Sequence, residues 1–149
     1  MSKLLHGLQT SWLTQSQRNK LDGFQAKCIR KITGVQHSYW SRITNETVLS
    51  YVGAHKLSKL LLEQQLLIIG KIFRRPCHDV LRQAIFQDNS VALRIHTKTR
   101  RRGRPKLSWA VQVQKFAMEI SGDNLSGAMV DESSWKRCVR RFCRTKISM

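Results

Sequence analysis

Acidic residues are scarce in this 149-residue sequence, which has 9 Asp and Glu against 27 Lys and Arg. The nine carboxylates form no compact acidic motif that would hold two metal ions for phosphoryl transfer. A glycine-rich loop of the Walker type and a nucleophile elbow are also missing, and the five histidines are scattered. The sequence therefore indicates no catalytic centre, no cofactor and no small-molecule substrate.

Long apolar runs are missing as well. No window approaches the ~20 apolar residues that a transmembrane helix needs. Residues 1–14 contain no apolar core of signal-peptide length. We therefore expect an intracellular protein that has no membrane partner and whose cysteines are reduced.

The four cysteines favour neither a disulfide framework, because we expect them to be reduced, nor a zinc site. Cys77, His78, Cys138 and Cys143 supply four possible ligands, but structural zinc sites normally bring together two closely spaced pairs. On a helix, a five-residue separation turns Cys143 well away from Cys138. We expect no metal site.

The charge balance is the strongest global feature of the sequence. The formal net charge is +18, and a compact domain with this imbalance repels itself unless an anion binds it. The basic residues occur along the whole chain, whereas a membrane-surface protein would concentrate them on one amphipathic helix with a large apolar face. The charge therefore favours nucleic acid as the partner.

Hydrophobic periodicity predicts an all-α protein of about six helices around a central apolar helix at 58–75, with a basic irregular loop near 88–107. The predicted helices are 16–33, 45–52, 58–75, 79–86, 108–121 and 133–146, with Thr44 or Asn45, Ser108 and Ser133 as N-terminal caps and Gly34, Gly53, Pro76 and Gly122 as stops. Residues 123–130 are expected to be a polar loop, and residues 4–13 are a candidate extended segment. We expect one basic helical domain, 1–149, made of a part at 1–87, a linker at 88–107 and a C-terminal helical pair at 108–149.

The most informative basic run contains Arg-Gly-Arg-Pro, the core of an AT-hook-like element. The run consists of Arg100, Arg101, Arg102, Gly103, Arg104, Pro105 and Lys106. In such an element glycine allows close approach to the minor groove, proline keeps the path extended, and arginines enter the groove. We favour the simpler alternative, a solvated basic loop that contacts phosphates without base preference. A polybasic signal that directs the protein to the nucleus is a third alternative.

Two predicted helices carry further basic faces. In the helix at 133–146, Trp135, Val139 and Phe142 form an apolar stripe with Cys138 beside it. A separate stripe consists of Arg137, Arg140, Arg141 and Arg144, and in the helix at 16–33 another consists of Lys20, Lys27 and Lys31, beside the apolar series Leu21, Phe24, Cys28 and Ile32. In so basic a chain a phosphate contact and a solvated face are equally good interpretations. Arg74 and Arg75 end a helix, where they compensate its dipole or contact a ligand.

Several segments match one ordered pattern. Residues 3–14 resemble LLYG-x-E-x-W-x-L, with His6 in place of Tyr and Gln9 in place of Glu. Residues 21–34 resemble L-x-x-F-x-x-R-C-L-R-x-I-L-G, and residues 42–49 resemble R-x-T-N-E-x-V-L. The remaining matches are residues 66–75, where Gly70 and Arg74 are kept and Lys71 replaces His, residues 102–106 with Trp109 (R-x-G-R-P-x-x-x-W), and Trp135 in the closing helix.

This ordered set resembles the C-terminal region, thumb and post-thumb, of non-LTR (LINE-type) retrotransposon reverse transcriptases. The resemblance implies a helical region that grips the template RNA–primer duplex, and a eukaryotic mobile-element origin. It implies that the RNA-directed DNA polymerase signature, with its catalytic aspartates, belongs to a palm domain upstream of this chain. The missing palm is then a second partner, and the chain is a truncated or degenerate copy of such an element.

The expected function is sequence-tolerant binding of a nucleic-acid duplex, either RNA–DNA hybrid or DNA, without catalysis. Three alternatives remain open. The first is a free-standing AT-hook-like DNA-binding protein. The second is an interaction module whose charge serves an acidic protein partner, and the third is a remnant that does not fold alone.

Overall fold

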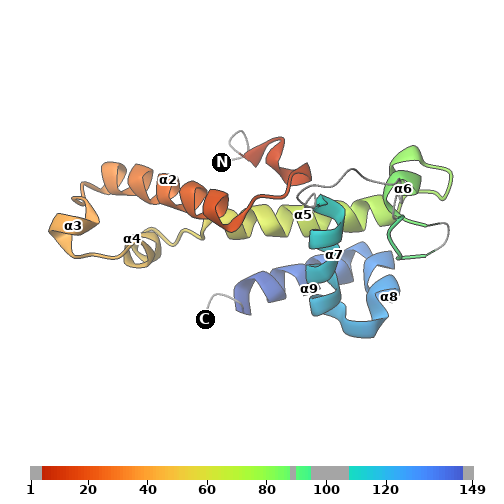
Figure 1. Cartoon of the computed structure of the whole chain (residues 1–149). Coiled ribbons are helices and arrows are strands. Elements are labelled where there is room, and N and C mark those ends of the chain that lie inside the picture. The colour runs from red at the N-terminus through yellow and green to blue at the C-terminus, as the bar shows by residue number, and fades with distance from the viewer. Residues whose placement is uncertain (1–4, 88–89, 95–107, 146–149) are drawn as a thin grey trace, which may run out of the picture. The chain divides into compact units, whose positions relative to one another are not determined.

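The computed structural model describes residues 5–87, 90–94 and 108–145. Over these residues the protein is all-α, as predicted, apart from one isolated β-bridge between Phe86 and Leu93. Eight α-helices and two short 3-10 helices occur in the described part of the chain (Figure 1). In chain order they are η1 (Leu8–Thr10), α2 (Gln15–Thr33), α3 (Ser38–Ser41), α4 (Asn45–Tyr51), α5 (Leu57–Phe73), α6 (Val80–Ile85), α7 (Trp109–Ser121), η2 (Gly122–Asn124), α8 (Leu125–Val130) and α9 (Glu132–Thr145).

The helices predicted from periodicity are confirmed, with ends that differ by a few residues. The capping residues explain the ends of two of them. Thr14 and Gln17 form a reciprocal capping box at the start of α2, and Gly34 ends that helix with φ 70°, a left-handed conformation that glycine adopts without strain. The side chain of Thr44 accepts a hydrogen bond from the amide of Thr47 and so starts α4.

Three local predictions are wrong. The polar loop predicted at 123–130 is instead the end of η2 followed by α8, because Leu125 and Met129, one helical turn apart, are buried in the core. Residues 8–10 form η1 rather than an extended segment, and the four-residue helix α3 was not predicted. The amides of Ser133 and Ser134 both donate to the carboxylate of Asp131, so Asp131, not Ser133, caps α9.

The chain divides into two compact units, whose boundary falls within α5. Unit 1 comprises the described residues of Met1–Trp12 and Leu62–Met149, and unit 2 comprises Leu13–Leu61. The linker expected at 88–107 lies mostly outside the described residues. Each unit has its own internal contacts, and each is described separately below.

A buried arginine organises unit 2. Arg30 of α2 donates hydrogen bonds to the backbone oxygens of Gln36 (2.7 Å) and Ile43 (2.5 Å) and to Asn45 Oδ1 (3.2 and 3.3 Å). A further bond runs to Ser41 Oγ (3.3 Å). The guanidinium therefore saturates backbone acceptors in the connections that flank α3, which would otherwise be costly to withdraw from water.

Two other polar side chains of α2 hold the start of α5. Gln25 is buried, donates to the carbonyl of His55 (2.8 Å) and accepts from the amide of Leu57 (2.9 Å). Asp22 accepts from the amide (2.9 Å) and the hydroxyl (2.6 Å) of Ser58. These bonds satisfy first-turn amides of α5, which have no partner within the helix.

The buried face of α2 is consequently not the apolar series that predicts the helix. Gln25, Ala26 and Arg30 are buried, whereas Phe24 is 52% exposed and Ile32 is 84% exposed. The polar residues are inside because each one makes several hydrogen bonds there. The apolar residues outside are left beside the lysines.

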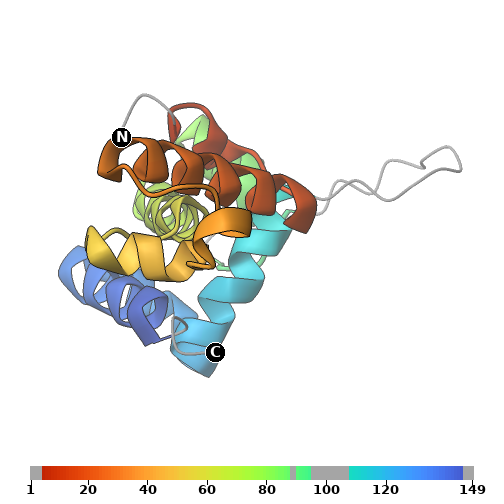
Figure 2. The same cartoon turned by 90° about the vertical axis from the view of Figure 1, so that its left-hand side faces the viewer.

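Unit 1 has a core formed by four helices. Leu66 and Ile69 of α5, Val113 and Ala117 of α7, Met129 of α8, and Trp135 and Val139 of α9 are fully buried. In Figure 1, α7 crosses α9 and does not run parallel to it. Figure 2 shows α7 leading into α8, after which the chain turns back into α9.

Candidate functional site

The described part of the site lies on α9, a helix with an apolar face and a cationic face. Trp135 and Val139 are fully buried, and Phe142 and Cys143 are half-buried beside them. The opposite face carries five exposed cations: Lys136, Arg137, Arg140, Arg141 and Arg144. With 3.6 residues per turn, the two sets occupy opposite sides of the helix. We call these five cations the α9 stripe.

Trp135 fixes the rotation of α9 about its own axis. It therefore also fixes the direction in which the α9 stripe points. Its indole Nε1 donates to the carbonyl of Leu66 in α5 (2.9 Å). Its ring fills the space above Gly70, where a Cβ would lie 2.4 Å from Nε1. Because the ring cannot turn without losing this bond and this packing, the cations are held on the solvent side.

The start of α9 is capped by a carboxylate. Asp131 accepts from the amides of Ser133 (3.2 Å) and Ser134 (2.8 Å), and these hydrogen bonds lower the pKa of Asp131 below its ordinary range. The neighbouring charge of Arg137 acts in the same direction. The negative cap also compensates the positive end of the helix dipole, so the first turn stays ordered next to the cations.

The α9 stripe is only partly neutralised by the protein itself. Lys136 forms an ion pair with Glu132, and Arg140 Nε lies 3.8 Å from Glu63 Oε1. Within the described ranges, Arg137, Arg141 and Arg144 have no carboxylate within 4.0 Å. These three guanidinium groups face solvent with their charge available to an external anion.

Arg74 and Arg75 have partners within the protein. The sequence had left two interpretations for them, dipole compensation and ligand contact. Arg74 donates to the carbonyl of Met129 (3.0 Å), and its guanidinium lies 3.9 Å from Glu132. Arg75 forms an ion pair with Asp79 at 2.9 Å. Both side chains are half-buried, so at least part of their role is to tie α5 to its neighbours.

The lysines predicted on α2 belong to unit 2. Lys20, Lys27 and Lys31 are all exposed, and Phe24 is exposed among them at spacings of three, four and seven residues. The three lysines therefore share one face of α2. The α9 stripe belongs to unit 1, and the α2 lysines belong to unit 2.

The AT-hook-like run lies outside the described residues. This applies to all of its members: Arg100, Arg101, Arg102, Gly103, Arg104, Pro105 and Lys106. The sequence prediction for this run stays a prediction.

Sequence reasoning missed Lys136 as a member of the α9 stripe, and it missed Lys71 as an exposed lysine of α5 close to the start of α9. The spacing contained a signal for Lys136, because it lies four residues before Arg140 and therefore on the same side of the helix. Lys71 could not be found in this way. It is on α5, and only packing brings α5 next to α9.

Over residues 5–87, 90–94 and 108–145, no three His, Cys, Asp or Glu side chains lie close enough together to hold a metal ion. Cys28 and Cys77 are exposed, and Cys138 and Cys143 are half-buried. None of the described helices is both long enough and apolar enough to span a bilayer.

The fold and the site define a basic, all-helical protein with a cationic face on its last described helix. Comparisons of the chain with protein-family models, with curated proteins and with solved structures find no match.

Proposed function

We propose that this protein is a non-catalytic, largely sequence-tolerant nucleic-acid-binding protein. The observation that carries the proposal is the α9 stripe, in which five exposed cations share one side of a helix that is anchored by its opposite side. Guanidinium groups match phosphate oxygens in geometry, and each contact releases counterions from the nucleic acid. A duplex backbone, either RNA–DNA hybrid or DNA, is the partner that fits such a surface.

We also propose that the chain corresponds to the thumb and post-thumb region of a non-LTR retrotransposon reverse transcriptase. Two contacts support this interpretation. Arg30, in the segment at 21–34, bonds to Asn45, in the segment at 42–49. Gly70, in the segment at 66–75, packs against Trp135 of the closing helix. Residues from different matched segments of the sequence are thus in contact in the fold.

The deciding experiment is a salt titration of binding to matched duplexes of A·T-rich DNA, G·C-rich DNA and RNA–DNA hybrid. The test variant is Arg141→Gln/Arg144→Gln, which removes two exposed charges. If both residues contact phosphates on DNA, the slope of log K against log salt becomes shallower by about 1.8, at about 0.9 per contact. The charge-matched control is Lys56→Gln/Lys115→Gln. Lys56 pairs with Glu46 and Lys115 is an exposed residue of α7, so both lie outside α9 and the slope should be kept.

The choice of duplexes separates the alternatives. Equal or tighter binding to the hybrid favours the reverse-transcriptase interpretation, and a strong A·T preference favours an AT-hook-like protein. Absence of binding to all three duplexes near physiological salt rejects nucleic-acid binding. Two alternatives then remain: an interaction module whose charge serves an acidic protein partner, and a remnant that does not fold alone. A cooperative thermal melt by circular dichroism, or its absence, then decides between these two.

A further inference from the structure

A groove in unit 1 lies between the second half of α5 and the start of α9. Its volume is about 510 Å³, within the range of small-ligand sites. Four cations line it: Lys71, Arg74, Arg75 and Lys136. The rest of the lining is apolar, from Leu67, Ile68 and Pro76, apart from a single carboxylate, that of Glu132.

The carboxylate of Glu132 is the anion that these cations already attract. It forms an ion pair with Lys136 and lies 3.9 Å from the guanidinium of Arg74. The hydrogen bond from Lys136, the charge of Lys136 and then the charges of Arg74 and Lys71 lower the pKa of Glu132. Three cations from two helices thus act on one negatively charged group, whose side chain is 56% exposed and therefore within reach of solvent anions.

The cations exceed this carboxylate in number. Arg75 is occupied by Asp79, but Lys71 is exposed on the rim of the groove, and only one carboxylate serves Lys71, Arg74 and Lys136 together. A site with excess positive charge and partly desolvated walls favours a further anion beside or in place of this carboxylate. A nucleotide phosphate is such an anion: a terminal monoester carries nearly two charges, and an internal phosphodiester carries one charge on two acceptor oxygens that several cations can share.

The apolar wall adds a second requirement. Leu67 and Ile68 are half-buried and expose aliphatic surface to the groove beside the cations. A free phosphate would leave this surface in water, whereas a nucleotide would place its base there, as proteins do when they hold an unpaired base between apolar side chains. The ligand class that satisfies both walls is a phosphate-bearing nucleotide.

We propose that this groove binds one unpaired nucleotide of a single-stranded segment, with its phosphate on Lys71, Arg74 and Lys136 and its base against Leu67 and Ile68. The proposal rests on the proposed function and extends it. Lys136 belongs both to the groove and to the α9 stripe, one turn before Arg140, so a strand leaving a duplex bound on the stripe leads into the groove. The incoming phosphate takes the place of the Glu132 carboxylate.

The test compares two probes with the full chain: a blunt duplex, and the same duplex with a single-stranded 5′ overhang of four nucleotides. Wild-type protein is expected to bind the overhang probe about fivefold more tightly. Abasic nucleotides in the overhang should reduce this preference, because the apolar wall then has nothing to cover it. Overhangs that end in a 5′-phosphate or a 5′-hydroxyl distinguish a terminal phosphate from an internal phosphodiester.

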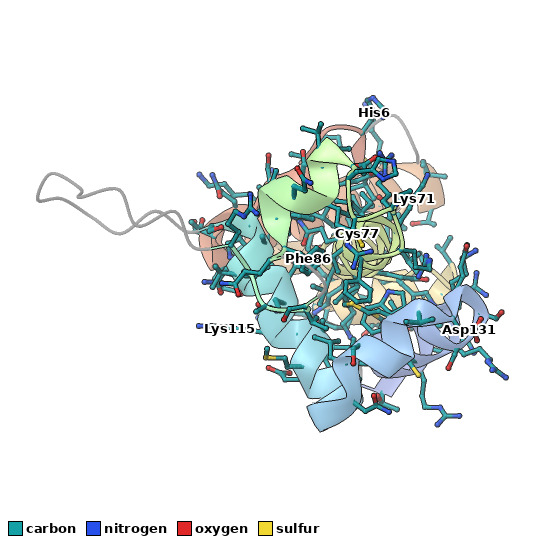
Figure 3. All side chains as sticks on the ribbon, turned by 90° about the vertical axis from the view of Figure 1, so that its right-hand side faces the viewer. His6, Lys71, Cys77, Phe86, Lys115 and Asp131 are labelled. Carbon is teal, nitrogen blue, oxygen red and sulfur yellow. The ribbon has the colours of Figure 1, made fainter. Side chains whose placement is uncertain are left out.

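Two variants should change the affinity for the overhang probe in opposite directions. Lys71→Gln should weaken binding of the overhang probe about two- to fivefold, and Glu132→Gln should tighten it by a similar factor because the competing carboxylate is gone. Binding of the blunt duplex should change little in Lys71→Gln. Lys115→Gln is the matched control, since Lys115 is an exposed lysine of α7 that Figure 3 shows on the side of unit 1 away from Lys71 and Asp131.

Equal affinity of the wild type for the two probes overturns the proposal. So does an equal loss for both probes in Lys71→Gln, or an affinity for the overhang probe that Glu132→Gln leaves unchanged. These outcomes leave binding to the blunt duplex and its dependence on Arg141 and Arg144 intact. Failure of the proposed function is different, because the wild type would then bind neither probe near physiological salt.

Discussion

Single residues fix the contact between α5 and α9. Gly70 is the point of closest approach, because a Cβ at that position would lie 2.4 Å from Trp135 Nε1 and 2.5 Å from Trp135 Cδ1. The indole N–H of Trp135 in turn donates a hydrogen bond to the carbonyl of Leu66. The orientation of the α9 stripe therefore depends on a glycine that lies in another helix and carries no charge.

Substitution of this glycine should destabilise the protein. In Gly70→Ala the added methyl group overlaps the indole of Trp135, and overpacking of this kind costs about 1–3 kcal/mol. The free energy of unfolding from urea denaturation, followed by circular dichroism and tryptophan fluorescence, measures the loss.

A glycine in another helix provides the control. Gly23 is inside α2, and a Cβ there would meet no atom within 4 Å. Gly23→Ala should therefore stabilise the protein by about 0.5–1 kcal/mol, because alanine has the higher helix propensity. Equal effects of the two substitutions would contradict the packing assigned to Gly70.

Helix α9 has an apolar side and a cationic side. Its apolar side builds the core of unit 1, and its cationic side faces solvent because the helical period places the two sets on opposite sides. Asp131 starts the helix, and its pKa is lowered by the hydrogen bonds from the amides of Ser134 and Ser133. The protonation state of this cap is thereby linked to the stability of the element that carries the site.

This linkage predicts a pH dependence. A carboxyl group whose pKa is lower in the folded state than in the unfolded state stabilises the fold at pH values above its ordinary pKa, which is near 3.9. This stabilisation is lost as the pH falls through the folded-state pKa. In Asp131→Asn the cap is kept but no longer titrates. The loss of stability between pH 6 and pH 3 should therefore be smaller in this variant than in the wild type.

Urea midpoints measured at several pH values test this expectation. Asp79, Glu46 and Glu132 also have lowered pKa values and will contribute to the wild-type curve. The informative quantity is therefore the difference between the two curves. Parallel curves for wild type and Asp131→Asn would show that Asp131 does not contribute.

At the scale of the whole molecule, the net charge of +18 makes folding and anion binding dependent on each other. An anion that binds the folded chain more tightly than the unfolded chain raises its stability by mass action. We expect the cations gathered on the α9 stripe to act as such a site, because in the unfolded chain they are no longer held on one side of a helix.

A small polyanion should therefore raise the melting temperature. With tripolyphosphate at about 100 times its Kd, the added stability is about 2.7 kcal/mol, which corresponds to several degrees in a domain of this size. Sodium chloride at the same ionic strength is the control for screening. An identical melting temperature in the two salts would show that the folded charge distribution has no particular affinity for phosphate.

The sequence by itself determined the all-α class, most of the helix positions and the cationic face of α9. These properties are local, since they follow from residue spacing within one helix and from capping residues next to it. Periodicity missed the helix within 123–130 and the buried face of α2. In both places long-range contacts decided the outcome: Leu125 and Met129 are buried in a core built from other helices, and Arg30 is buried by its bonds to the connections around α3.

Only the tertiary structure decided which helix lies beside α9 and what surrounds its first turn. Lys71 and Lys136 are 65 positions apart in the chain, and no spacing rule relates them. They line one groove because Gly70 allows Trp135 to approach α5 closely. The physical reason is that side-chain spacing specifies the face of a helix, whereas the packing of one helix on another depends on shape and volume at contacts between distant residues.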